Sequence, residues 1–313
     1  MRLTPRAWTL IAGLVALAVI PLIAEAVDET YYVTLVSRIM VFAIAALSLD
    51  LILGFGGMVS FGHAAYIGTG AYAVGILAHY GIYDGALQFI AAIVGSGLVA
   101  ALIGYFCLRT SGMYFIMITL AFTQMLFFLG VSIEEFGGDD GMNTRRSRLF
   151  GSRILDDDTA LYYLVLVMLV ACAYLGWRFI NSRFGMAIRG AMSNENRMQA
   201  IGFPTFRYKL VAFVIAGMMC GVAGFLLGNV TKFVTPEFMN WLRSGEILVM
   251  VLMGGMGTLF GPLFGAATFL VVEELLSSFT PHWQIIMGPF LVVLVLFAKR
   301  GIWSLIPARR GDG

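Results

Sequence analysis

The sequence contains repeated apolar runs of about 20 residues, the length that an α-helix needs to cross a lipid bilayer. Hydrophobic residues make up 60% of the 313-residue chain, and charged residues make up only 12%. Soluble domains are about 45–50% apolar and about 25% charged. Because one buried core cannot take up so many apolar side chains, much of the surface must meet lipid. We therefore expect an all-α polytopic membrane protein.

About ten segments have the length and composition of membrane-spanning helices. Two of them, near 59–79 and 243–257, are interrupted or flanked by glycine, which predicts broken or re-entrant helices. The sequence leaves open whether these two cross the bilayer fully. The predicted set is 7–26, 31–53, 59–79, 86–107, 112–132, 160–180, 208–230, 243–257, 259–278 and 283–299.

The first apolar run also resembles a signal peptide. Arg2 and Arg6 precede it, and Ala24-Glu25-Ala26 has the small-x-small form of a cleavage site. The run is long for a cleaved signal and nearly long enough to span. We expect a retained first helix, with cleavage as the alternative.

Loop charges predict the orientation, because cytoplasmic loops carry an excess of Lys and Arg. With ten alternating spans, most basic residues fall on the side of the N-terminus and most acidic residues on the other side. Both termini are then cytoplasmic. Arg145, Arg146, Arg148 and Arg153 oppose this trend, although their loop also holds many acids.

The chain reads as one transmembrane permease domain over residues 1–313. Its two largest loops are an outer loop at 133–159 and a basic inner loop at 181–207. No GxxxxGK[ST] phosphate-binding loop occurs, so we expect no ATP site of that kind and no cofactor bound by this chain.

Several classes of function have no support in the sequence. The net charge is +2 and no run of Lys and Arg could follow a phosphate backbone, which argues against nucleic acid as a partner. Cys107, Cys172 and Cys220 lie in separate apolar segments without metal or redox spacing. The three histidines form no metal set.

The inner loop at 181–207 predicts a short helix on the cytoplasmic face. Ser193 or Asn194 is expected to cap its start, and Glu195 suits the positive end of the helix dipole. Gly202 and Pro204 are expected to end it. Such a helix of about two turns, with Arg197 in it, would serve as a rigid handle for a cytoplasmic motor. The alternative is an ordinary connecting loop that carries positive charge.

Two glycine motifs resemble one another. Residues 54–65 read GFGGMVSFGHAA, and residues 254–267 read GGMGTLFGPLFGAA. Internal duplication with glycine-broken segments at matching places points to a translocation pathway. The freed backbone groups must face protein or a watery cavity, because lipid cannot satisfy them. Tight helix packing is the alternative explanation of the glycines.

Polar residues in or beside these motifs are the candidate pathway residues. Thr119 shares a helix face with Thr123, and both could instead bond to their own backbone carbonyls. A lone histidine such as His63 is more often a packing residue than a ligand. The candidates are Asp50, Gly57, Ser60, His63, Thr119, Gln124 and Gly255.

Four stretches resemble the permease subunits of branched-chain amino-acid ABC importers of the LivM type. They are residues 46–72, 111–122, 182–202 and 248–265, and the likeness extends from about 31 to 303. The resemblance implies a multi-pass protein of the bacterial inner membrane. It implies three kinds of partner besides the lipid bilayer: a second homologous permease, two cytoplasmic ATPase subunits that hold ATP, and a periplasmic substrate-binding protein.

The sequence keeps other functions open. Asp139 and Asp140 stand in the outer loop where related permeases tend to be uncharged, so a permease for urea or short amides remains an alternative. A self-sufficient transporter or channel would need its own coupling-ion site. A membrane-embedded enzyme would need titratable groups converging at one depth, which the sequence alone does not assemble.

Overall fold

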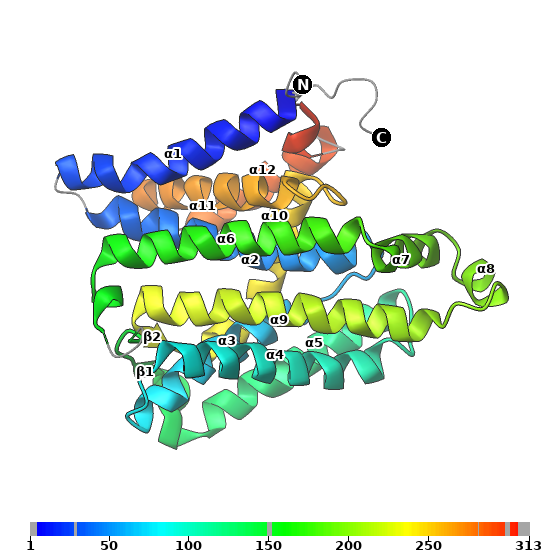
Figure 1. Ribbon diagram of the computed structural model, residues 1–313, viewed down its shortest axis with the longest axis horizontal. Helices are drawn as coiled ribbons and strands as arrows, with labels where there is room; N and C mark the ends of the chain where they lie inside the picture. Colours follow the sequence, from blue (N-terminus) through cyan, green and yellow to red (C-terminus); the bar gives the residue numbers. More distant parts are fainter. Residues whose placement is uncertain (1–4, 28–29, 149–151, 281, 298–300, 306–313) are drawn as a thin grey trace.

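The protein, seen here as a computed structural model, is built almost entirely from α-helices, and the structure describes residues 5–27, 30–148, 152–280, 282–297 and 301–305 (Figure 1). Short 3₁₀ turns and one two-stranded ribbon join the helices. The helices are α1 (Pro5–Val27), α2 (Thr30–Leu53), α3 (His63–His79), α4 (Gly85–Cys107), α5 (Met113–Ser132), α6 (Asp158–Ile180), α7 (Arg183–Ser193), α8 (Glu195–Ala200), α9 (Thr205–Thr231), α10 (Trp241–Gly254), α11 (Gly261–Phe279) and α12 (Trp283–Phe297).

Helices α2 and α9 form the centre of the bundle. α9 packs against α2, α3 and α4, and α2 also packs against α6 and α11. Small residues allow the close approach of α9 to α3, because a Cβ atom added at Gly224 would lie 2.1 Å from the carbonyl oxygen of Ile67. Large apolar side chains on α4, α5 and α6 point outward instead, as expected for surfaces that meet lipid.

Six helices are long and apolar enough to cross a membrane, by length and composition. They are α2 (from Tyr31), α4, α5, α6, α9 and α11. The chain is thus an all-α polytopic membrane protein, whereas the count of ten spans stays a prediction.

The two segments expected to be broken are short helices that meet the glycine motifs. α3 has 17 residues and starts after Gly62, and α10 has 14 residues and stops at Gly254. At 1.5 Å per residue they are about 26 and 21 Å long, less than the roughly 30 Å of a hydrocarbon core.

The segment between α6 and α9 differs from the prediction of a single helix of two turns. It holds two helices, α7 with 11 residues and the shorter α8 with 6. α7 was not predicted because Gly185 and Gly190 lower helix propensity. Ser182 was an available signal, since its hydroxyl caps α7 by accepting from the Gly185 amide at 3.2 Å.

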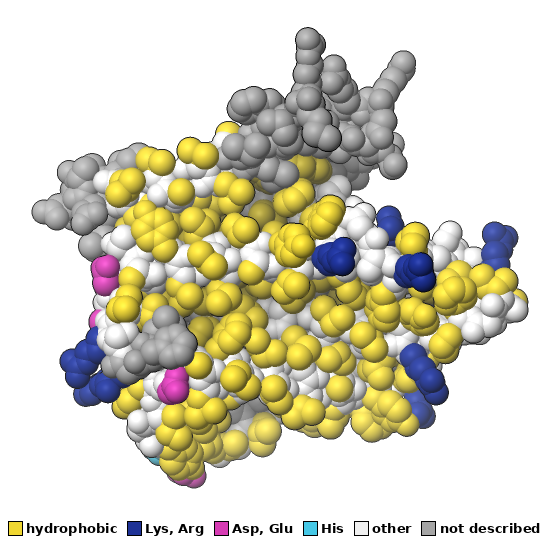
Figure 2. Space-filling view, viewed as in Figure 1, with side chains coloured by type: hydrophobic (Ala, Val, Ile, Leu, Met, Phe, Trp, Pro, Cys, Tyr) yellow, Lys and Arg dark blue, Asp and Glu magenta, His cyan; other side chains and the backbone are white. Residues whose placement is uncertain are grey.

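Charged side chains are concentrated at the two ends of the bundle, and only one end shows acidic side chains on this face (Figure 2). Lys and Arg lie along the end that bears α7 and α8, and others are visible at the opposite end. The acidic side chains visible on this face lie at the opposite end, where the ribbon of β1 (Met142–Asn143) and β2 (Phe233–Val234) is located.

The loop at 133–159 is folded onto the bundle, not extended from it. Met142 pairs with Val234 in the ribbon. The buried Arg146 guanidinium donates to the carbonyl oxygens of Leu155 (3.1 Å) and Asp156 (2.9 Å) and pairs with Asp158. These bonds hold the loop against the start of α6.

Candidate functional site

The two glycine motifs meet in space. A Cβ atom added at Gly54 would lie 2.2 Å from the backbone nitrogen of Gly257, so only glycine permits this approach. The buried Asp50 carboxylate accepts the Gly257 N–H at 2.9 Å. Asp50 therefore ties the end of α2 to the break between α10 and α11.

The first break is the non-helical segment between α2 and α3. Side chains from other helices form hydrogen bonds with its free backbone groups. The Phe61 N–H donates to the Thr119 hydroxyl at 3.2 Å, and the Thr123 hydroxyl lies 3.0 Å from the Phe61 carbonyl oxygen. The first turn of α3 is satisfied from α10, because the Ala64 N–H donates to the Ser244 hydroxyl at 2.9 Å. These bonds give the backbone N–H and C=O groups the hydrogen-bond partners that lipid lacks.

Both threonines also bond within their own helix. The Thr119 hydroxyl donates to the Ile116 carbonyl at 2.9 Å, and the Thr123 hydroxyl lies 2.9 Å from the Thr119 carbonyl. The alternative of bonding to their own backbone is therefore seen, each side chain also contacts the chain at Phe61, and a place in the translocation pathway stays a prediction.

Ser60 lies in the segment between α2 and α3, His63 is the first residue of α3, and both are fully buried. The Ser60 hydroxyl accepts the Gly62 N–H at 3.0 Å. The His63 ring packs edge-on against Tyr66 at 5.5 Å between centroids. Neither ring nitrogen of His63 has a hydrogen-bond partner among the described residues, and the same holds for the second Asp50 carboxylate oxygen.

The remaining pathway candidates occupy different places. Gly255 ends α10 with φ of +115° and is buried, so it shapes the second break without lining open space. The Gln124 amide oxygen is buried without a partner among the described residues, and Gln124 directly follows Thr123 in α5. Gly57, with φ of +67°, lies against α7.

The coupling residues form a small capped unit. The Asn194 side chain accepts the Arg197 N–H at 2.9 Å and so caps α8, as one of the two predicted caps. Gly202 follows α8 with φ of +90°, a conformation that favours glycine. Ser193 is the last residue of α7, so α7 and α8 meet at a sharp corner.

Glu195 joins this unit to the bundle. Its carboxylate accepts from the Lys209 ammonium at 2.6 Å and from the Thr205 hydroxyl at 3.0 Å, both on α9. Arg197 is exposed and forms no ion pair with any residue that the structure describes. Glu195 therefore positions α8, whereas Arg197 is free to contact a partner.

α7 rests on the first glycine motif. A Cβ atom at Gly56 would lie 3.4 Å from the Cγ2 methyl of Ile188, and one at Gly57 would lie 3.0 Å from the Cγ atom of Met192. Ile188 is only 2% exposed. A displacement of α7 would therefore press directly on the break that precedes α3.

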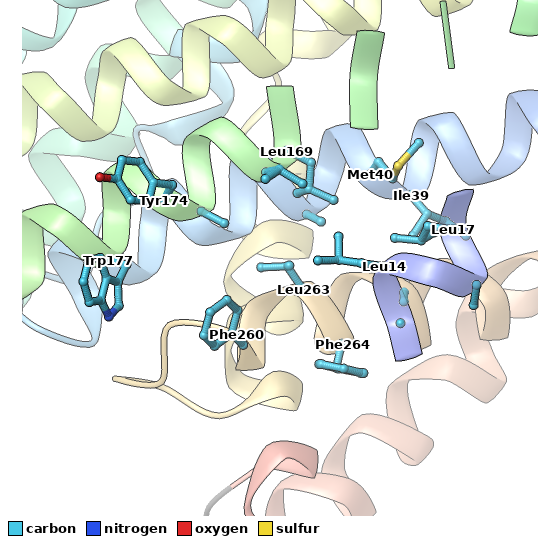
Figure 3. Close-up of a pocket in the computed structure, with 16 residues that line it drawn as sticks. Leu14, Leu17, Ile39, Met40, Leu169, Tyr174, Trp177, Phe260, Leu263 and Phe264 are labelled. Carbon is cyan, nitrogen blue, oxygen red and sulfur yellow. The ribbon is translucent and has the colours of Figure 1, made fainter. Parts of the chain in front are cut away.

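Two cavities differ in lining and position, and the first adjoins the second glycine motif through Phe260 and Phe264. One, of about 600 Å³, is apolar and is bounded by α1, α2, α6 and α11, with Leu14, Met40, Leu169, Trp177 and Phe264 among its lining residues (Figure 3). The other, of about 320 Å³, lies in the 133–159 loop and is lined by Arg145, Arg148, Arg153 and Lys232 among others.

The sequence did not reveal a cluster of charged side chains on α2, α10 and α11. Arg38 and Glu273 approach to 3.6 Å, and Arg243 and Glu246 to 2.8 Å. Glu273 also interacts electrostatically with Arg243 and Glu246. The only available signal was that each is an ionisable residue inside an apolar segment, which by itself marks a candidate site.

Comparison with known proteins identifies the family. The model of the family described as the permease component of the branched-chain amino acid transport system matches residues 31–298. The chain belongs to this family.

Individual permeases agree with this assignment. The high-affinity branched-chain amino acid transport system permease protein LivM of Salmonella typhimurium is 27% identical over 298 residues, which cover 86% of this chain and 69% of that protein. LivM of Escherichia coli is 27% identical over 84% of this chain and 68% of its own length. LivH of Escherichia coli is 23% identical over 83% of this chain and 90% of its own length. No solved structure matches the permease significantly.

Proposed function

We propose that this chain is the inner-membrane permease subunit of an ATP-binding-cassette importer and forms the translocation pathway for branched-chain amino acids. The family assignment supports the transport role and the substrate class. The observation that carries the mechanism is the contact of α7 with Gly56 and Gly57, because it joins an exposed handle to a break in the membrane domain.

The proposed partners follow from the two ends of the bundle. Two cytoplasmic ATPase subunits would grip the basic end, which bears α7 and α8, here and on a second homologous permease. A periplasmic binding protein would deliver the amino acid to the end that holds the 133–159 loop. The first turn of α1 and the short turn at Ile302–Leu305 lie toward the basic end, which supports cytoplasmic termini (Figure 1).

The proposed mechanism is a two-state movement of the glycine breaks. ATP binding would shift α7, and the shift would reach the backbone at Gly57 through Met192. The Asp50–Gly257 bond would pass the shift to the second break. Ligands and nucleotides then bias a pre-existing equilibrium between inward-open and outward-open states.

Reconstitution into liposomes tests this function. The complete assembly, with binding protein outside and ATP inside, is expected to accumulate leucine. Matched controls are a complex with hydrolysis-deficient ATPase subunits and the chain alone, and neither should accumulate it. Leucine uptake by the chain alone, or uptake of urea in place of leucine by the full assembly, would contradict the proposal.

A further inference from the structure

The charged cluster of Arg38, Arg243, Glu246 and Glu273 lies within the membrane part of the chain. Arg38 is eight residues from the start of α2, and Glu273 is six residues from the end of α11. At 1.5 Å per residue these positions are about 12 and 9 Å from the helix ends. Charged side chains at such depth are costly in lipid and face protein or water.

The cluster is partly exposed on the surface of this chain. Side-chain exposure is 34% for Arg38 and 16% for Glu273, and 29% for Arg243 and 27% for Glu246. Because lipid is an unsuitable neighbour for these groups, the face of α2, α10 and α11 that carries them must meet water or another polypeptide. A translocation pathway between two permease subunits supplies both.

The internal pairing leaves bonding capacity unused. One carboxylate oxygen of Glu273 is buried without a hydrogen-bond partner among the described residues. The other carboxylate oxygen, Oε1, lies 3.6 Å from the Arg38 guanidinium, farther than the usual 2.7–2.9 Å of a charge-assisted hydrogen bond. The cluster as a whole offers two cationic and two anionic groups, and Glu274, which accepts a hydrogen bond from Tyr31, lies beside it.

We propose that this cluster binds the zwitterionic head group of the amino acid as it crosses the membrane. Arginine recognises the α-carboxylate, for which its planar guanidinium is well shaped. Glutamate recognises the α-ammonium. The packing of Arg38 near the Phe42 ring, 5.9 Å from its centroid, helps to hold the guanidinium in place. This assignment rests on the proposed transport function and adds the chemistry by which the membrane domain recognises its cargo.

A double substitution separates cargo binding from a purely structural role. Replacing both members of a buried ion pair by apolar residues of similar size is often neutral or stabilising, whereas removing one member is damaging. The double variant Arg38→Met, Glu273→Met should therefore still assemble if the ion pair has only a structural role. The exposed Glu237 provides a control, as Glu237→Gln removes a carboxylate away from the cluster.

The measurement is leucine moved per ATP hydrolysed in liposomes at saturating loaded binding protein. We expect the double variant to lose roughly tenfold or more of this ratio, as for lost hydrogen bonds to charged groups. ATPase stimulation by the binding protein should be retained, and Glu237→Gln should match the unsubstituted complex. A double variant with normal transport overturns the inference.

A second measurement uses the unsubstituted complex, so it does not depend on the variant's assembly. A diazirine analogue of leucine, delivered by the binding protein and irradiated during turnover, should label peptides of α2, α10 and α11 near the cluster. Labelling confined to other helices overturns the inference. If the unsubstituted complex moves no leucine, it is the transport function that fails.

Discussion

At the scale of single residues, the close approach of Gly54 to Gly257 is one of several backbone contacts that only glycine permits. The two backbones meet so closely that no side chain fits between them, and the Asp50 carboxylate bonds across the contact. The sequence alone showed two similar glycine motifs but not that they touch.

Gly54→Ala tests this contact. We expect it to lower the midpoint of thermal unfolding of the detergent-solubilised complex and to reduce transport, because the methyl group would overlap backbone atoms that cannot move independently. Gly95→Ala on α4 is the matched control. Its methyl group would meet only the Thr69 methyl at 3.6 Å, and a helix gains about 0.5–1 kcal/mol when alanine replaces glycine. Equal destabilisation by the two substitutions would contradict the assigned contact.

At the scale of elements, Glu195 fastens α8 to α9, and α8 also packs against α7, where a Cβ atom at Gly190 would lie 2.9 Å from the Met198 sulfur. The Glu195–Lys209 pair is partly exposed, so its contribution to folding stability is modest, about 0–1 kcal/mol. Its effect should instead appear in how firmly α8 is held.

Charge reversal separates the roles of Glu195 and Arg197. Glu195→Lys places two ammonium groups together and should lower transport-coupled ATPase activity while membrane insertion is unchanged. Adding Lys209→Glu should restore coupling, because the pair is re-formed with its charges exchanged. Arg197→Glu should also lower coupling, and no change on α9 should rescue it. Normal coupling in both single variants would refute the handle assignment.

At the scale of the whole molecule, the charge difference between the two ends predicts the orientation. The three native cysteines are buried, so reagents added to vesicles should find little background. A cysteine at either end of the bundle therefore reports which side of the membrane it faces.

Asn196→Cys on α8 should react with a membrane-impermeant maleimide in inside-out vesicles and not in right-side-out vesicles. Asp139→Cys in the 133–159 loop should show the opposite pattern. Both sites are exposed at the protein surface, so a missing reaction reflects the membrane and not burial. Labelling of Asn196→Cys from the periplasmic side would overturn both the orientation and the coupling proposal.

Properties that depend on near neighbours were determined by the sequence itself. The apolar runs require a membrane, the glycine motifs lie where α3 begins and where α10 ends, and Asn194 caps α8. Each follows from a few consecutive residues, because helix length, backbone freedom and capping are local.

The tertiary structure alone decided which distant groups meet. The bond from Gly257 to Asp50 joins residues 207 positions apart, and the charged cluster draws on three separate helices. In a membrane helix almost every side is apolar, so periodicity does not reveal which face packs inward or against which neighbour. Only the packing of small residues between helices sets that register, and with it the position of each buried polar group.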